Sequence, residues 1–367
     1  QQEKSLQLFT NMIEYQSGEK LSRKNIMTKK VLVTGGAGFI AHHVVEKLLN
    51  ETDWDIVTLD RLDFSGNLNR LADVLKDVPA EKKKRVQVVF HDLKSEVNPM
   101  IQTLLGDVNI VLHLAAGSHV DRSIEFPMEF IMDNVIGTAN ILQYARTLKN
   151  LERFIYFSTD EVFGPAPKGV NYKERDRYNS TNPYSASKAA GEEICVAFEN
   201  TYGMPIYITH TMNVFGERQH PEKFIPLVIR KVRDGDKVMI HSNKERTEAG
   251  SRHYIHAKDV ADGLLFLLNL KDVNFERDYG DAKCPKFNLV GPEEVNNLEL
   301  AKLIAEAQNK ELNYELVDFH SSRPGHDLRY ALSGDYMESL GWKPKISLRE
   351  RIKEVVSWTL ENDRWLK

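Results

Sequence analysis

The sequence predicts an α/β fold in which a doubly wound parallel sheet is followed by a smaller mixed α/β region at the C-terminal end. Three observations lead to this prediction. Short β-branched segments alternate with helical periodicity up to about residue 214, as parallel strands and their covering helices do. A glycine-rich turn joins the first strand to the first helix. Beyond Phe215 the elements become shorter and the alternation loosens.

The expected strands are short and apolar, as strands buried on both faces are. The first strand, 31–33, runs into the glycine turn, after which apolar residues recur with helical spacing. The other expected strands are 56–60, 86–90, 110–114, 154–158 and 206–210. We expect long helices at about 126–148 and 183–202, then helices near 221–232, 258–270, 298–309 and 348–361 and a strand near 238–241.

The chain divides into three expected segments. Residues 1–26 are interpreted as an appended or accessory N-terminal extension, because Met27 leads directly into the first strand and would make a natural start. Residues 27–214 are expected to form the sheet domain, to which later segments return. Residues 215–367 are expected to form the smaller region that closes over the sheet.

Composition narrows the possible functions. The chain has 367 residues, of which 41% are hydrophobic and 28% are charged, so it can bury a large core. Its formal net charge of -4 gives no general attraction to nucleic acid or to a membrane surface, and no apolar run reaches the roughly 20 residues of a membrane span. Cys195 and Cys284 lack metal-ligand spacing and are too few for a disulfide framework, which favours a reducing, cytoplasmic setting. We expect no metal, nucleic acid or membrane partner.

The glycine turn indicates a dinucleotide site in a Rossmann-like sheet. In the pattern Gly35-x-x-Gly38-x-x-Ala41 the backbone turns tightly, and the N–H groups of the following helix point at a pyrophosphate. Asp60 ends the second strand, where a carboxylate holds ribose hydroxyls, so we expect NAD, although Arg61 leaves NADP as an alternative. The other expected cofactor contacts are Phe39, Ile40, Asp92, Leu93, Leu114, Ala115, Ala116, Ser158, Tyr184 and Lys188.

Two further segments indicate catalysis. Tyr184 and Lys188 are four residues apart and share a helix face, so the ammonium is expected to favour the phenolate. Thr159, at the end of the fifth strand, is placed to hydrogen-bond a reacting oxygen. Asp160 and Glu161 follow it, and adjacent carboxyls in different environments can serve as acid and base at one pH. The alternative for this pair is a solvent-exposed acidic turn or helix cap.

These residues make the chain resemble the extended short-chain dehydrogenase/reductase family, which implies a nucleotide-sugar substrate. Within that family it is most similar to the nucleoside-diphosphate-glucose 4,6-dehydratases, especially those acting on dTDP-glucose. The resemblance runs from Met27 almost to the C-terminus. It rests on 34–40 (TGGAGFI), 118–124 (SHVDRSI), 158–161 (STDE), 184–188 (YSASK), 220–226 (HPEKFIP) and 323–327 (RPGHD).

The resemblance implies a role for each catalytic residue. Tyr184 would take the proton of the sugar 4-hydroxyl while hydride passes from C4 to NAD, with Thr159 bound to that oxygen. Glu161 would then remove the C5 proton, and Asp160 would protonate the departing 6-hydroxyl. Hydride would return to C6, so that NAD is regenerated. The product would be a 4-keto-6-deoxy sugar.

The resemblance also implies nucleotide-sugar contacts and an assembly. The expected substrate-binding residues are Ser118, His119, Asn213, Lys223, Arg252, Asn288, Arg323 and His326. Members of the family commonly pair through two long helices in a four-helix bundle, so we expect a homodimer that uses 126–148 and 183–202. Two departures leave the sugar and base open, dTDP-glucose or UDP-glucose. Gly117 stands where the dTDP-glucose enzymes usually have glutamate, and 243–250 is longer and more charged than expected.

Two other readings remain open. A nucleotide-sugar 4-epimerase or decarboxylase of the same superfamily would keep the glycine turn and the Tyr184/Lys188 pair. Epimerases do not need the Asp160-Glu161 pair, and the decarboxylases usually have serine before the glutamate. A catalytically idle dinucleotide-binding regulator is the more distant alternative, since it could lose Tyr184 or Lys188 without penalty.

Overall fold

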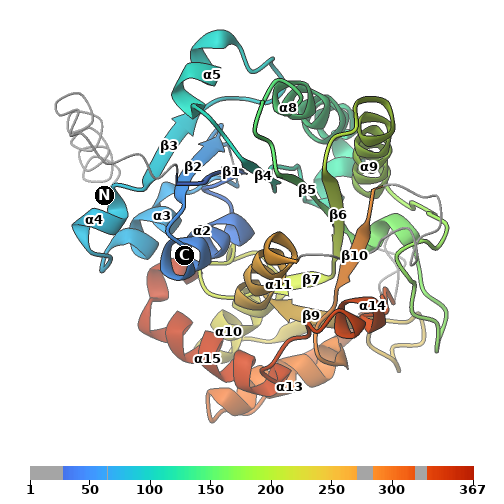
Figure 1. Ribbon diagram of the computed structural model, residues 1–367. Helices are drawn as coiled ribbons and strands as arrows, with labels where there is room; N and C mark the ends of the chain where they lie inside the picture. Colours follow the sequence, from blue (N-terminus) through green and yellow to red (C-terminus); the bar gives the residue numbers. More distant parts are fainter. Residues whose placement is uncertain (1–27, 64, 271–283, 319–328) are drawn as a thin grey trace.

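The computed structural model describes residues 28–63, 65–270, 284–318 and 329–367, and is built around one seven-stranded parallel sheet. The strand order is β10-β6-β5-β4-β1-β2-β3 (Figure 1). The predicted doubly wound parallel sheet is therefore confirmed. The strands are β1 (Lys30–Thr34), β2 (Asp55–Asp60), β3 (Val86–Phe90), β4 (Ile110–His113), β5 (Arg153–Thr159), β6 (Ile206–Thr211) and β10 (Lys286–Leu289).

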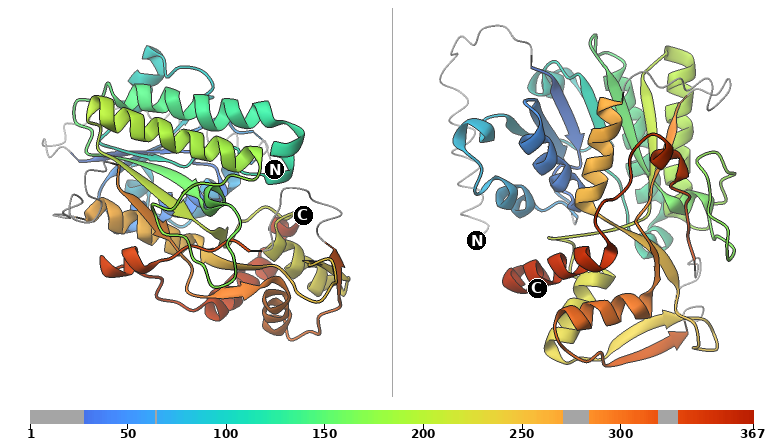
Figure 2. Two further views of the ribbon diagram at one scale, coloured as in Figure 1. Left: turned by 90° about the vertical axis from the view of Figure 1, so that its right-hand side faces the viewer. Right: turned by 60° about the horizontal axis from the view of Figure 1, so that its bottom comes forward.

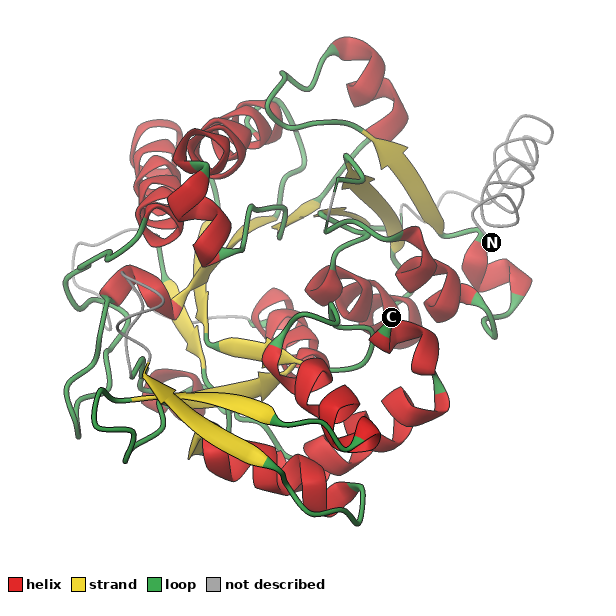
Figure 3. Ribbon diagram, turned by 180° about the vertical axis from the view of Figure 1, so that it is seen from behind, coloured by secondary structure: helices red, strands yellow, loops and turns green. Residues whose placement is uncertain are grey.

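Helices cover both faces of this sheet, as the view from behind in Figure 3 also shows. Alternate residues of β1 pack against the helices on opposite faces of the sheet. Val31 and Val33 join the core beneath α2 (Phe39–Glu51) and α11 (Ala257–Asn269), whereas Leu32 joins the core beneath α5 (Pro99–Leu105), α8 (Gly137–Ala145) and α9 (Pro183–Tyr202). This alternation is the period-two pattern of a strand buried on both sides. Helices α3 (Leu68–Leu75) and α4 (Ala80–Lys83) lie between β2 and β3 in the chain.

The C-terminal region has its own core and two small sheets (Figure 2). One sheet has the order β11-β9-β7, and the other pairs β8 with β12 in parallel. The strands are β7 (Asn213–Phe215), β8 (Val238–Ser242), β9 (Ser251–His256), β11 (Glu294–Asn296) and β12 (Tyr314–Asp318). The helices are α10 (Phe224–Asp234), α13 (Asn297–Ala307), α14 (Asp335–Ser339) and α15 (Leu348–Glu361), with a final 3₁₀ turn, η3 (Asp363–Leu366).

The helix expected at 126–148 is broken into parts. The chain forms α6 (Val120–Glu125), α7 (Pro127–Ile131), a π-helical turn η1 (Met132–Ile136) and then α8. Phe126 leaves the helical region with φ -127° and ψ 62°, and Pro127 starts the next helix, where its missing N–H costs nothing. The π turn buries Asn134, and such single-turn π segments often occur at functional sites.

The topology fixes where a ligand can bind. The strand order reverses between β1 and β4, and in open α/β sheets ligands bind beyond the carboxyl ends of the strands at such a point. A cavity of about 1400 Å³ lies there, between the sheet and the C-terminal region. Among the described ranges, no helix is long and apolar enough to cross a membrane.

Candidate active site

The large cavity collects most of the residues that the sequence singles out. Its walls come from the carboxyl ends of β1, β2, β4 and β5 and from α10 and β9 of the C-terminal region. The predicted residues in its walls are Gly35, Gly38, Phe39, Ile40, Asp60, Arg61, Asp92, Leu93, Leu114, Ala115, Ala116, Ser118, His119, Ser158, Thr159, Asp160, Glu161, Tyr184, Lys188, Asn213, Lys223 and Arg252.

One predicted substrate residue, Asn288, is not brought to this cavity. Asn288 is fully buried in β10, where its amide binds His210 at 2.9 Å and donates to the backbone carbonyls of Tyr172 and Ser333. Those bonds saturate the side chain, so its place in the structure is that of a structural residue. Arg323 and His326 lie outside the described residues.

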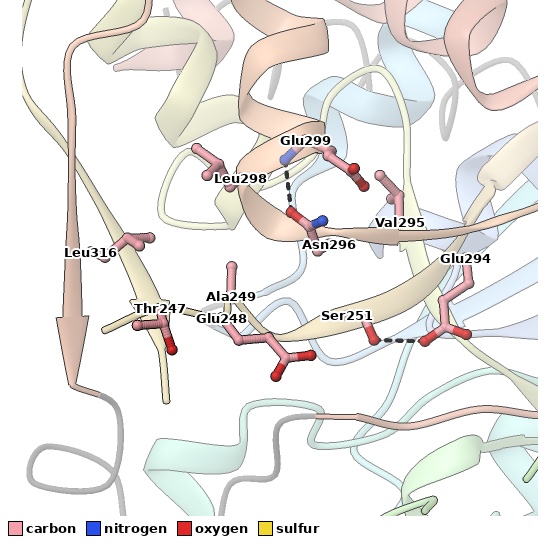
Figure 4. A pocket seen from close by; sticks show the side chains of 10 residues that line it. All are labelled: Thr247, Glu248, Ala249, Ser251, Glu294, Val295, Asn296, Leu298, Glu299 and Leu316. Atoms are coloured by element: carbon pink, nitrogen blue, oxygen red, sulfur yellow. Dashed lines mark hydrogen bonds between the residues drawn. The ribbon is translucent and has the colours of Figure 1, made fainter. Parts of the chain in front are cut away.

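A second, smaller cavity of about 410 Å³ contains none of the predicted residues (Figure 4). It lies between the start of α13 and the loop before β9, and its walls carry Glu248, Glu294 and Glu299. Glu294 accepts from Ser251 Oγ at 2.6 Å and from the Arg329 guanidinium at 2.8 and 2.9 Å. This carboxylate therefore serves to join β9, β11 and the chain near Arg329.

The glycine turn brings the backbone unusually close to its neighbour strand. Gly35 has φ +70°, and a Cβ built on it would lie 2.9 Å from the Cα of Ala115. Gly38 caps α2 without any side-chain bond to the first turn, and its N–H donates to Gly35 O at 2.7 Å. The helix therefore presents bare N–H groups and the positive end of its dipole to the cavity, as a pyrophosphate site requires.

Asp60 lies beside this turn at the end of β2. Its Oδ2 accepts from the Ala37 N–H at 3.0 Å and its Oδ1 from the Leu62 N–H at 2.8 Å, which orients the carboxylate. Burial raises the pKa of Asp60, and the two backbone donors oppose that shift. Because it also lines the cavity, Asp60 is placed to accept hydrogen bonds from ribose hydroxyls.

The N-terminus of α9 holds Tyr184 in place. Asn182 and Ser185 form a capping box, Pro183 occupies the first turn, and Ser123 Oγ accepts from the Tyr184 N–H at 3.1 Å. The Tyr184 ring packs edge-on against Phe130, with 6.4 Å between ring centroids. These contacts hold the phenol near the carboxyl end of β5, where Thr159 lies.

The electrostatics of the tyrosine differ from the sequence expectation. Burial, and next the charges of Glu161 and Asp160, raise the pKa of the Tyr184 phenol, while a hydrogen bond with Thr159 lowers it. Lys188 donates from Nζ to Phe157 O at 2.7 Å, and burial lowers the pKa of its ammonium to about 8. The protein alone therefore holds Tyr184 as a neutral phenol, and a further positive charge is needed to make it a base near neutral pH.

The two carboxyls after β5 lie in different environments. Thr159 caps the short 3₁₀ turn η2 (Asp160–Phe163) and donates to Asp160 Oδ1 at 3.0 Å. Asp160 is 5% exposed; burial first, and then the charge of Glu161, raise its pKa to about 7. Its Oδ2 has no hydrogen-bond partner among the described residues. Glu161, by contrast, accepts from Asn182 Nδ2 at 3.1 Å. Asp160 is thus prepared to hold a proton, while the neighbouring Glu161 is oriented by the Asn182 amide.

The sequence analysis missed a buried anion one turn beyond Lys188. Glu192 is fully buried and accepts from Ser158 Oγ at 2.5 Å, and its other oxygen contacts Tyr178, His210 and Lys286. These cationic and hydrogen-bonding partners overcome burial and lower the pKa of Glu192 to about 2. Its charge also raises the pKa of Lys188 against the effect of burial. The helical i, i+4 spacing was the one sequence signal for this residue.

Asn134, on the π turn, is a second missed residue. Its side chain bonds both backbone groups of Gly117, at 2.8 and 3.0 Å, and donates to Ser187 Oγ at 2.8 Å. It therefore ties the loop that carries Ser118 and His119 to α9. Nothing in its sequence surroundings marked an asparagine in the middle of an expected helix as a tether.

A glycine-turn cofactor crevice, an Asp at the end of β2 and a Thr/Tyr/Lys set at the end of β5 define an extended short-chain dehydrogenase/reductase. The model of the family described as GDP-mannose 4,6 dehydratase matches residues 32–355. The chain belongs to this 4,6-dehydratase family.

Several similar proteins agree with this assignment. The chain is 34% identical over 362 residues to dTDP-glucose 4,6-dehydratase 1 of Escherichia coli K12, covering 92% of this chain and 94% of that protein. It is 35% identical to the dTDP-D-glucose 4,6-dehydratase of Mus musculus, covering 91% and 89%. Among solved structures, the dTDP-glucose 4,6-dehydratase DesIV of Streptomyces venezuelae, crystallised with NAD bound, superposes with a TM-score of 0.79 at 31% identity, covering 92% of this chain and 99% of that one.

A solved relative with another activity has a similar fold. The UDP-glucose 4-epimerase of Thermus thermophilus, in complex with NAD, superposes with a TM-score of 0.76 at 28% identity, covering 90% of this chain and 98% of that one. Fold similarity alone therefore does not separate dehydration from epimerisation. The residues at the site have to do so.

Proposed function

We propose that this protein is an NAD-dependent nucleoside-diphosphate-glucose 4,6-dehydratase that converts dTDP- or UDP-glucose to the 4-keto-6-deoxy sugar. The observation that carries the proposal is the pair Asp160 and Glu161, two adjacent carboxyls in different environments beside Tyr184. An epimerase has no step that needs both. The family membership and the names of the relatives support the same reaction class.

The cavity fits a dinucleotide. The close approach of Gly35 to Ala115 and the bare N-terminus of α2 leave space and donors for a pyrophosphate, and Asp60 is placed for the adenosine ribose. Bound there, NAD would supply the hydride acceptor for C4 oxidation and the hydride donor for C6 reduction. Its nicotinamide ring would also add the positive charge that the buried phenol of Tyr184 lacks.

The residues at the end of β5 would then move the protons. Tyr184 takes the proton of the sugar 4-hydroxyl, and the Thr159 hydroxyl, which lies near the phenol, would turn from Asp160 Oδ1 to hold the same oxygen. The 4-ketone acidifies the proton on C5, which Glu161 removes while Asn182 orients its carboxylate. Asp160, with a pKa of about 7, gives its proton to the departing 6-hydroxyl. The hydride would then return to C6 and Glu161 would give its proton back to C5, so that water is lost and no net oxidation results.

The C-terminal region would hold the nucleotide. We assign the diphosphate and sugar to Lys223 and Arg252 of this region, together with Asn213, Ser118 and His119 of the sheet domain, because all five line the cavity. Arg252 is near enough to Asp160 to lower its pKa slightly against burial. This assignment gives residues 27–214 the cofactor and the chemistry and residues 215–367 mainly the substrate. Two buried free cysteines fit a cytoplasmic setting.

An exposed apolar strip supports the proposal of a homodimer. Large apolar side chains on α6, α7 and η1 are 37–64% exposed, and α9 packs beside these helices. The strip consists of Ile124, Phe126, Met128, Ile131, Met132 and Ile136. We expect Met128→Lys with Met132→Lys to give a monomer in light scattering, whereas Met100→Lys, at a still more exposed methionine on α5, should leave the dimer intact. A wild-type monomer would contradict the assembly.

The function is tested by incubating the purified chain with dTDP-glucose, UDP-glucose and GDP-mannose and analysing the products by mass spectrometry. We expect the loss of one water with no net NADH. In Glu161→Gln the oxidation step should still occur, so enzyme-bound NADH should accumulate, whereas the exposed control Glu96→Gln should behave as wild type. A product of unchanged mass with an inverted 4-hydroxyl would refute the dehydratase and favour the epimerase.

A further inference from the structure

Arg61 occupies the position where the choice between NAD and NADP is made. It directly follows Asp60 at the end of β2 and lines the cofactor cavity. In dinucleotide folds an arginine near this point can accommodate the extra 2′-phosphate of NADP. The presence of Arg61 in the sequence therefore leaves the cofactor undecided, and the contacts of its guanidinium decide it.

The guanidinium is held by carboxylates on three sides. Asp133 accepts two parallel bonds, from NH1 at 2.5 Å and from NH2 at 2.7 Å. Asp63 accepts from Nε at 2.8 Å and from NH2 at 2.5 Å, and Asp92 lies 3.5 Å from NH1. A guanidinium has five N–H donors in a rigid fork, and four of them are bonded here. The fifth belongs to NH1, the nitrogen that lies 3.5 Å from Asp92. Little of the fork is left for a phosphate.

The local charge also opposes a phosphate. Arg61, Lys94, which pairs with Asp92 at 3.4 Å, and Arg70, whose charge acts on Asp60, carry three positive charges. Asp60, Asp63, Asp92 and Asp133 carry four negative charges, so the formal sum is -1. Asp133 first, and then Asp63, also raise the pKa of Arg61 above its usual value, so Arg61 stays ionised within this cage of carboxylates. A 2′-phosphate would add further negative charge to this cluster.

We propose that Asp63 and Asp133 are cofactor-specificity residues, which hold Arg61 away from the ribose and so make this chain select NAD and reject NADP. The inference rests on the proposed function only in requiring a dinucleotide in this cavity. The π turn η1 makes the arrangement possible, because it turns Asp133 towards Arg61 while the next residue, Asn134, binds the Gly117 loop.

The proposal is tested on the full chain stripped of cofactor, by calorimetric titration with NAD and with NADP. Wild type should bind NAD in strong preference. In Asp63→Asn/Asp133→Asn the cage keeps its shape but loses two charges, so the NADP/NAD affinity ratio should rise at least about tenfold. Adding Arg61→Ala should abolish that gain. The exposed Asp77→Asn removes a charge away from the cavity and should change neither affinity.

Each outcome decides the question. The proposal is overturned if the double variant keeps the wild-type NADP/NAD affinity ratio. It is also overturned if the ratio rises in the double variant and stays raised after Arg61→Ala is added. Should the double variant fail to fold, as judged by circular dichroism, Asp133→Asn alone carries the same prediction at smaller size. If wild type binds neither dinucleotide, the proposed function itself fails, and that result is distinct from binding both equally.

Discussion

The raised pKa of Asp160 makes a prediction about stability that is independent of any substrate. A carboxyl whose folded pKa is about 7, against about 3.8 in the unfolded chain, keeps its proton longer in the folded state. Between these values the folded protein binds more protons than the unfolded one, so stability falls as pH rises. The loss ends once pH exceeds the folded pKa. Asp160→Asn removes this titration and should remove the pH dependence with it.

The size follows from about 1.36 kcal/mol for each pH unit over which the two states differ. From pH about 5 to the folded pKa of about 7 the difference spans two units, so wild type should lose roughly 3 kcal/mol relative to Asp160→Asn by pH about 8.5. The new amide leaves an N–H where Oδ2 had no partner among the described residues, at a cost of about 1–3 kcal/mol. That cost does not depend on pH, so it cancels from the comparison.

The assay is urea denaturation of the cofactor-free chain at the two pH values. We expect the difference in unfolding free energy between Asp160→Asn and wild type to grow by roughly 3 kcal/mol from the lower to the higher pH. The exposed control Glu96→Gln should show no such growth. A difference that stays flat with pH would show that Asp160 titrates normally, and its role as the proton donor would lose its physical basis.

Three further predictions concern the surroundings of this carboxyl. Glu192→Gln leaves the largely buried Lys286 beside a neutral amide and should cost about 3–5 kcal/mol in urea unfolding. It also removes the charge that raises the pKa of Lys188, so this pKa should fall and the pH–rate profile should shift with it. Gly117→Glu places a Cβ 3.1 Å from the Phe130 ring and should cost about 1–3 kcal/mol, part of which Phe130→Leu should restore. Tyr184→Phe should lower turnover by about 10²–10⁴ and leave NAD affinity within error of wild type in calorimetry.

The sheet was predictable because its strands carry strong local signals. The apolar runs at 31–33 and 86–90 match β1 and β3 within one residue at each end. Helix 183–202 was placed to the residue, because Asn182 and Pro183 start it and Gly203, with φ +67°, stops it. The strands β7, β9, β10, β11 and β12 were missed. β7 and β11 have three residues each, β9 begins with polar residues, and the pairing partners of all five are distant in the sequence.

The site was predictable where one motif carries several residues, and less so where partners are distant. Residues 158–161 reach one cavity with Tyr184 and Lys188, because β5 ends and α9 begins at the same edge of the sheet. Glu192, by contrast, looks like an ordinary charge on a solvated helix face until Tyr178 and Lys286 are brought to it by a loop and by β10. The raised pKa of the phenol could not be predicted from residues 184–188 alone, because it comes from burial and from the two carboxyls after β5.

The buried ion network explains how the two carboxyls at the end of β5 come to lie in different environments. Glu192 ties Ser158 to α9, and Asn182 at the start of the same helix orients Glu161, so both ends of residues 158–161 are anchored to α9. Asp160 lies between these anchors, and its Oδ2 has no hydrogen-bond partner among the described residues, so burial, and next the charge of Glu161, raise its pKa. Weakening either anchor should let Asp160 reach water and lower its pKa. The difference between acid and base in this site is thus a property of how α9 holds the end of β5.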